Sequence, residues 1–136
     1  EHVQNRLVIE NCERQYGIED VLELSSRVQR PVVFDTHHHA CYSTLVEPQQ
    51  DASVYMDAIL DSWTRLDIRP KFHVSEQDPQ KRTGAHSKYV YTIPDYLLDK
   101  DVDIMIEAKQ KEQSVLYLQH KYTPYKSNTR RASHTN

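Results

Sequence analysis

Short apolar runs that lead into a carboxylate or a histidine alternate along the chain with segments of helical periodicity. The apolar runs cover residues 6–11, 31–35, 69–76 and 102–108. Helical spacing of apolar residues follows in 17–29, 51–66 and 109–122, and Pro94 marks a short helix or turn within 91–100. Strands that alternate with helices predict an α/β fold with a parallel sheet and right-handed crossovers.

The two-residue period of a strand divides each run into an apolar face and a polar face. In 69–76, Lys71 and His73 share one face and Phe72 shares the other with Val74. For the helix in 51–66, the expected core positions are Val54, Ala58, Leu60 and Trp63. The apolar strand faces are expected to meet the helices, and the polar faces to converge at the carboxyl ends of the strands, where α/β folds place their sites.

A cluster of carboxylates and histidines is expected at that end of the sheet. Its candidates are Glu10, Asp35, His38, Lys71, His73, His86 and Glu107. Carboxylate and imidazole together suit Zn, Mn or Fe better than Ca or Mg alone. So many anions in one place would raise one another's pKa without cations, so a metal site is the favoured interpretation.

Single members of this set have ordinary alternatives. Asp35 alone reads as a helix cap or a loop acid, and "HHH" at 37–39 as a solvated loop. The sequence does not decide which of these three histidines points inward. Lys71 is unusual beside metal ions, because they repel an ammonium. It either faces a substrate phosphate, is deprotonated, or is carboxylated.

Composition excludes several other classes of protein. The 136 residues carry a net charge of -3 with a mean hydropathy of -0.79, and no apolar run is long enough for a membrane helix. No signal peptide is evident, the first residue is not Met, and the two cysteines read as reduced thiols, so we expect an excised piece of a cytoplasmic protein.

Positive charge is unevenly distributed along the chain. Possible phosphate contacts are Lys81, Arg82, Lys109 and Lys111, for which a solvated face is the plain alternative. The segment 123–136 is basic and carries no acid, and it reads as a flexible tail.

The segments "RLVIEN", "PVVFDTHHH", "KFHVSE", "GAHS" and "DVDIMIEAKQKE" together resemble the C-terminal half of the UV damage endonuclease family. The resemblance implies half of a TIM-type (β/α)8 barrel in residues 1–122, related to endonuclease IV. It also implies bound divalent metal, most typically Mn with Zn or Mg as alternatives, and nicking of damaged double-stranded DNA on the 5′ side of UV photoproducts and other lesions.

Site roles follow from the same resemblance. The metal ligands would be Glu10, Asp35, His38, His73, His86 and Glu107, and the catalytic residues Glu10, Lys71 and Glu107. Lys71 would match the lysine that family members can carry in carboxylated form.

The chain is too short for the whole fold, because a full barrel needs about 250 residues. We therefore expect an inactive fragment that lacks the N-terminal half-barrel and is prone to form a homodimer through its open sheet edges. Two other functions stay open. One is a metal-dependent sugar isomerase on a related barrel, and the other is a non-catalytic assembly module.

Overall fold

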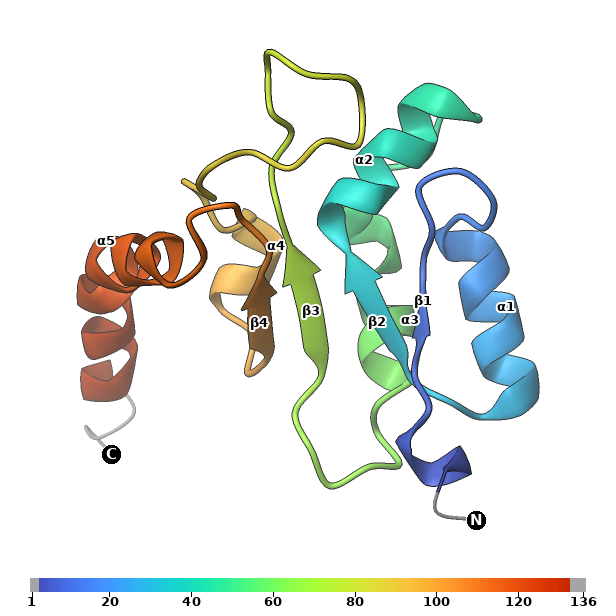
Figure 1. Cartoon of the computed structure of the whole chain (residues 1–136). Helices are drawn as coiled ribbons and strands as arrows, with labels where there is room; N and C mark the ends of the chain where they lie inside the picture. Colours follow the sequence, from blue (N-terminus) through green and yellow to red (C-terminus); the bar gives the residue numbers. More distant parts are fainter. Residues whose placement is uncertain (1–2, 133–136) are drawn as a thin grey trace.

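Four parallel strands form a single sheet in the order β1-β2-β3-β4 (Figure 1). The computed structural model describes residues 3–132, with side chains up to Thr123. The strands are β1 (Ile9–Glu10), β2 (Val32–Asp35), β3 (Lys71–Val74) and β4 (Asp103–Ile106). Each strand pairs in parallel with the next along the chain, which confirms the predicted α/β class with four β-α units.

Helices connect the strands and cover one face of the sheet. They are α1 (Ile18–Val28), α2 (Thr36–Leu45), α3 (Met56–Asp61), α4 (Asp95–Leu98) and α5 (Lys111–Ala132), with 3-10 turns at Gln4–Arg6 and Ala52–Tyr55. In Figure 1, α3 and α4 lie behind the sheet, α1 flanks β1, and α5 flanks β4. The helix α2 rises directly from the carboxyl end of β2, on the side where the site is expected.

The hydrophobic core lies between the sheet and these helices. On β3, Phe72 and Val74 are buried, whereas Lys71 and His73 on the opposite face are only half-buried. Phe34 on β2 packs edge-on against Phe72, with ring centroids 6.4 Å apart. The period of two thus separates the core from the polar face, as the sequence predicts.

Three element boundaries differ from prediction. Residues 36–45 form α2, where a turn was expected after the strand. The predicted helix 51–66 is shorter, because the chain begins it as a 3-10 turn and leaves the α-helix at Asp61. The last helix continues beyond residue 122 to Ala132, into the segment predicted as a tail. Residues 133–136 lie outside the described part of the chain, and flexibility of the tail stays a prediction.

The early 3-10 turn also changes which residues of this segment are buried. Tyr55, Met56, Ile59 and Trp63 are buried, whereas Val54 is 57% exposed. The predicted core positions of Val54 and Ala58 are therefore wrong, since both are exposed, whereas Leu60 is half-buried and Trp63 is buried. The 3-10 turn rotates side chains by a different angle from an α-helix and so shifts the buried face of the segment.

Within residues 3–132, none of the helices combines the length and the apolar character needed to cross a bilayer.

Candidate metal centre

Asp35 ends β2 and at the same time caps α2. Its side chain is 1% exposed. Oδ1 accepts hydrogen bonds from the backbone N–H groups of His37 and His38, both at 2.9 Å. Oδ2 is buried and has no hydrogen-bond partner among the described residues. A buried, unpaired carboxylate oxygen is costly, so this atom is suited to a bound cation.

Two further side chains bring donor atoms to Asp35. The donor atoms of Glu10, Asp35 and His73 all lie within 4.8 Å of one another. His73 Nδ1 is 3.1 Å from Glu10 Oε1 and 3.9 Å from Asp35 Oδ2. Ligand bonds of about 2 Å place donors roughly 3–4 Å apart around one ion, so this group fits a divalent cation with little movement.

The register of the sheet explains why these residues meet. Asp35 is the direct neighbour of His73 across the β2–β3 pair, and Glu10 sits at the end of β1. Parallel strands end on the same side of a sheet, so residues far apart in sequence share one edge. The predicted convergence at this edge is therefore present in the structure for Glu10, Asp35 and His73.

Three other predicted ligands extend this group on both sides. His38 Nδ1 is 3.5 Å from Asp35 Oδ2 and 3.7 Å from Glu10 Oε1. On the other side, Glu107 Oε1 is 3.4 Å from His73 Nδ1, and Glu107 Oε2 is 3.8 Å from His86 Nε2. The result is a continuous row of carboxylates and imidazoles, whose role as ligands stays a prediction.

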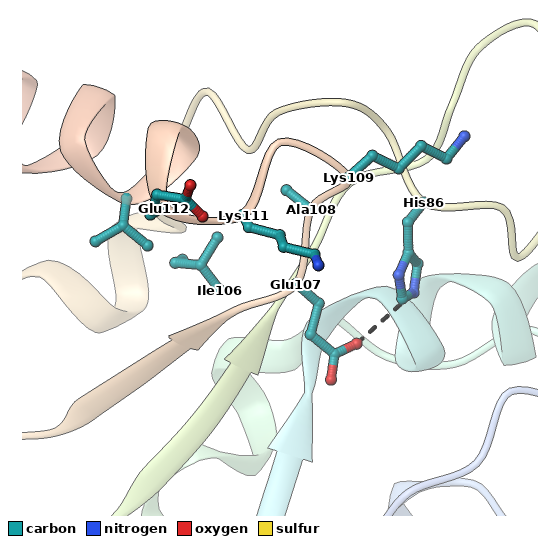
Figure 2. A pocket seen from close by; sticks show the side chains of 8 residues that line it. His86, Ile106, Glu107, Ala108, Lys109, Lys111 and Glu112 are labelled. Atoms are coloured by element: carbon teal, nitrogen blue, oxygen red, sulfur yellow. Dashed lines mark ion pairs between the residues drawn. The ribbon is translucent and has the colours of Figure 1, made fainter.

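An open cavity of about 490 Å³ lies beside the far end of this row. Figure 2 shows Glu107 and His86 facing each other at its border, with Lys109 and Lys111 close by. These two cationic side chains thus stand next to the acidic row.

Among the three consecutive histidines, the structure places only His38 beside the carboxylates Glu10 and Asp35. His37 is buried, with Nε2 3.6 Å from Cys41 Sγ and its ring 5.6 Å from that of His86. His39 Nε2 lies 2.9 Å from the Gln50 carbonyl oxygen, and its ring packs against Phe34.

Lys71 stands apart from the three-residue group. Its Nζ lies 3.3 Å from Asp103 Oδ2, its neighbour on β4. Lys71 forms no other ion pair with the described residues. Its predicted catalytic role and its carboxylation stay predictions.

Burial and like charges change the protonation of the group. Burial raises the pKa of Glu10, and the charge of Asp35 adds to this, although His73 opposes it. Burial disfavours the charged form of His38, but Asp35, the Asn11 carbonyl and Glu10 outweigh this and raise its pKa. Protons therefore compete with a cation for Glu10 and His38 more strongly than at the ordinary pKa values of these side chains.

Asn11 is a site residue that the sequence analysis missed. It is 1% exposed. Its Nδ2 donates to the Asp35 carbonyl oxygen at 3.0 Å, and its Oδ1 accepts from the Asp35 N–H at 2.8 Å. Its own backbone carbonyl lies 3.0 Å from His38 Nδ1. Its place directly after Glu10 in "IEN" is the only signal that the sequence offers.

Gln77 is a second missed residue, and it braces the loop that carries His86. Its Oε1 accepts from Gly84 N at 2.9 Å, and its Nε2 donates to Arg82 O at 2.9 Å. The backbone of Gln77 also forms an antiparallel bridge with His86. The loop is thus closed on itself, which fixes His86 toward Glu107.

The predicted phosphate contacts lie on the same side of the sheet. Lys109 Nζ is 3.4 Å from Asp78 Oδ2. Lys109 also lies beside Lys81, and its hydrogen bond and charge lower the pKa of Lys81. Arg82 and Lys111 are exposed. Contact with nucleic acid stays a prediction for all four.

Comparison with known proteins assigns this arrangement to one family. A family described as UV-endonuclease UvdE matches residues 1–134. The chain is 39% identical to the UV-damage endonuclease of Schizosaccharomyces pombe, over 88% of this chain and 21% of that protein. It is 30% identical to the UV DNA damage endonuclease of Bacillus cereus strain Q1, over 98% of this chain and 43% of that protein.

A solved structure agrees with the sequence matches. The crystal structure of SacUVDE superimposes with a TM-score of 0.72 at 27% identity, and covers 90% of this chain and 41% of that one. The chain therefore spans less than half the length of the relatives that it matches.

Proposed function

The chain belongs to the UV-endonuclease UvdE family, and from this we propose that the whole protein is a DNA-repair endonuclease. It would nick damaged double-stranded DNA on the 5′ side of UV photoproducts and other lesions by metal-assisted phosphodiester hydrolysis. The observation that carries the proposal is that Asp35 Oδ2 is buried, makes no hydrogen bond with the described residues and lies within reach of Glu10 and His73.

The residues on the row have distinct roles in this proposal. Glu10, Asp35 and His73 would hold one divalent cation, most typically Mn, with Zn or Mg as alternatives. His38, His86 and Glu107 would provide ligands for further ions. When bound, the cations supply Lewis-acid polarisation of the phosphodiester group.

The chain itself prepares the site for that chemistry. The amides of α2 hold Asp35 in place before a cation arrives, so little reorganisation is needed on binding. Glu10 and His38 would hold the cation in their deprotonated forms, so their raised pKa values make binding sensitive to pH. Lys81, Arg82, Lys109 and Lys111 would hold backbone phosphates beside the row, where they carry no sequence information.

The chain on its own is proposed to be inactive. The outer edges of β1 and β4 have no paired strand among the described residues, and a half-barrel that lacks its N-terminal partner would pair there with that half or with a second copy. Free Cys12 and Cys41 agree with a reducing, cytoplasmic setting.

A plasmid nicking assay tests the proposed function. The full-length protein with Mn²⁺ is expected to relax UV-irradiated supercoiled plasmid and to leave untreated plasmid intact. Glu10→Gln should abolish this activity, whereas the matched control Glu23→Gln, an exposed acid that pairs with Arg27 on α1, should retain it. Equal activity of Glu10→Gln and the native protein would contradict the proposal. Ketose–aldose conversion without nicking would favour the isomerase instead.

A further inference from the structure

Three tyrosine rings form a compact cluster on the surface near the metal centre. Tyr89 and Tyr91 stack with centroids 5.7 Å apart at 27°. Tyr117 on α5 meets both edge-on, with centroids 6.4 Å and 5.7 Å away. Tyr91 is 48% exposed and Tyr117 is 43% exposed. We call these three residues the tyrosine cluster.

The backbone beneath the tyrosine cluster is fixed by one buried and two exposed hydrogen bonds. Val90 is fully buried, and its N–H donates to Ser114 Oγ on α5 at 2.9 Å. Glu76 Oε1 accepts from Tyr91 N at 2.7 Å, and Lys121 Nζ donates to Tyr91 O at 2.6 Å. The rings are therefore held in place before any partner arrives, which reduces the entropy lost on binding.

The tyrosine cluster is connected to the metal centre by a short backbone ladder. Lys109 N donates to Ser87 O at 3.2 Å, and Gln110 N donates to Lys88 O at 2.9 Å. Ser87 and Lys88 join His86 to Tyr89 along one strand-like segment. A chain bound at the His86–Glu107 end of the row would thus meet the tyrosine cluster next.

The surroundings of the cluster carry more positive than negative charge. Lys88, which precedes Tyr89 in the chain, is exposed, and Lys121 stands against Tyr91, whereas Glu76 is the carboxylate that contacts this segment through the Tyr91 N–H. Neither lysine joins an ion pair with the side chains described up to Thr123. Cations beside exposed aromatic rings match a polyanion with flat bases better than an apolar protein surface.

The absent half of the barrel is a poor occupant for this surface. The flank of α5 that lines the hollow against β4, the edge strand, contains Val115 and Gln119. Tyr117 lies instead on the flank toward the 89–91 loop, between two elements that are both present in this chain. The tyrosine cluster is therefore not at the open edge of the sheet.

We propose that the tyrosine cluster is a stacking platform for unpaired bases of a DNA strand that continues from the metal centre. The origin of that strand rests on the proposed nuclease function, but the stacking itself does not depend on metal. Bases of any sequence present a flat face to tyrosine, so the platform should bind without sequence preference.

A binding assay without metal tests this proposal. The full-length protein in EDTA is titrated into a fluorescein-labelled single strand of about 12 nucleotides, and fluorescence anisotropy gives the affinity. Tyr91→Ala and Tyr117→Ala are each expected to weaken single-strand binding about fivefold or more, which is the lower end for loss of one stacked base. Tyr117→Phe keeps the ring and should bind like the native protein.

Two controls separate stacking from other effects. Leu116→Ala alters the residue that precedes Tyr117 on α5, which is 62% exposed and has no aromatic ring, and should not change the affinity. A blunt duplex of the same sequence offers no unpaired base inside, so the alanine variants should bind it normally. Native-like single-strand affinity of both alanine variants would overturn the platform, as would an equal loss on single strand and duplex.

The outcome is independent of the nicking assay. Loss of single-strand affinity in Tyr91→Ala, in a protein that nicks no irradiated plasmid, would support the platform and contradict only the proposed function. Normal nicking together with unchanged single-strand affinity of the variants would contradict only the platform.

Discussion

Replacing Asn11 with alanine would release the clamp that holds Asp35 at the end of β2. The Asn11 amide satisfies both the N–H and the carbonyl of Asp35, at 2.8 Å and 3.0 Å. Asp35 is fully buried, so neither backbone group can turn to bulk water after the substitution. The Asn11 carbonyl that contacts His38 belongs to the backbone and is kept. The substitution therefore acts on Asp35 rather than on His38.

The expected cost follows from these two groups. A buried polar group left without a partner costs about 1–3 kcal/mol. A water molecule can occupy part of the space left by the amide, so we expect Asn11→Ala to lower the free energy of unfolding by roughly 2–4 kcal/mol. Loss of a residue that orients a ligand typically weakens metal binding about 10- to 100-fold.

Urea unfolding followed by circular dichroism measures the first effect, and calorimetric titration with Mn²⁺ measures the second. Asn5→Ala is the matched control, because Asn5 is exposed and its side chain makes no hydrogen bond with the described residues. Asn11→Asp would bury a further carboxylate beside Glu10 and Asp35, where like charges repel it, so it should lose at least as much stability as Asn11→Ala.

Two results would refute this reasoning. If Asn11→Ala were no less stable than Asn5→Ala, the two hydrogen bonds would contribute nothing net. If stability fell but Mn²⁺ affinity stayed the same, Asn11 would support the fold without orienting Asp35 for a cation.

Three further predictions concern protonation, the loop and Lys71. Glu10 and His38 both have raised pKa values, so protons compete with the cation for these side chains. The Mn²⁺ affinity measured by calorimetry should therefore fall as the pH drops through the pKa of His38, which lies above its ordinary 6.5. Glu10→Gln should make this fall shallower, and an affinity that does not change with pH would contradict the prediction. Gly84 has φ +98°, and an added Cβ would lie 3.0 Å from Glu13 Oε2. Gly84→Ala should therefore lower the free energy of unfolding in urea by about 1–3 kcal/mol. A stability equal to that of the native protein would show that the loop relaxes freely. Lys71→Met should cost less than about 1 kcal/mol, because its ion pair is half-exposed, yet it should reduce plasmid nicking strongly; unchanged nicking would limit Lys71 to that ion pair.

The sheet and its polar edge could be predicted because their signals are local and repeated. Alternation in 69–76 separates Phe72 from His73, and parallel strands bring their carboxyl ends to one side. The meeting of Asp35 with His73 therefore needed only the order of the strands, since each strand pairs with the next in sequence. The family resemblance agreed with this pattern at the same residues.

Features that depend on single contacts could not be predicted. The helix α2 has almost no apolar periodicity, and Asp35 begins it through two backbone hydrogen bonds. The helix-cap interpretation of Asp35 is confirmed through Oδ1, whereas Oδ2 makes no hydrogen bond with the described residues and its role as a metal ligand stays a prediction. Asn11 acts by geometry across 24 positions of sequence, which no spacing rule detects. Lys71 shares a strand face with His73, but its side chain is drawn to Asp103 instead.

The divided carboxylate of Asp35 has a consequence for any attempt to transfer this centre to another barrel. One oxygen caps the helix and the other makes no hydrogen bond with the described residues, so the proposed ligand and the start of α2 depend on the same side chain. A grafted aspartate followed by a loop would turn both oxygens to other partners. A redesign would have to transfer the end of β2, the first turn of α2 and Asn11 together. In evolution, substitutions at these three places would be expected to depend on one another.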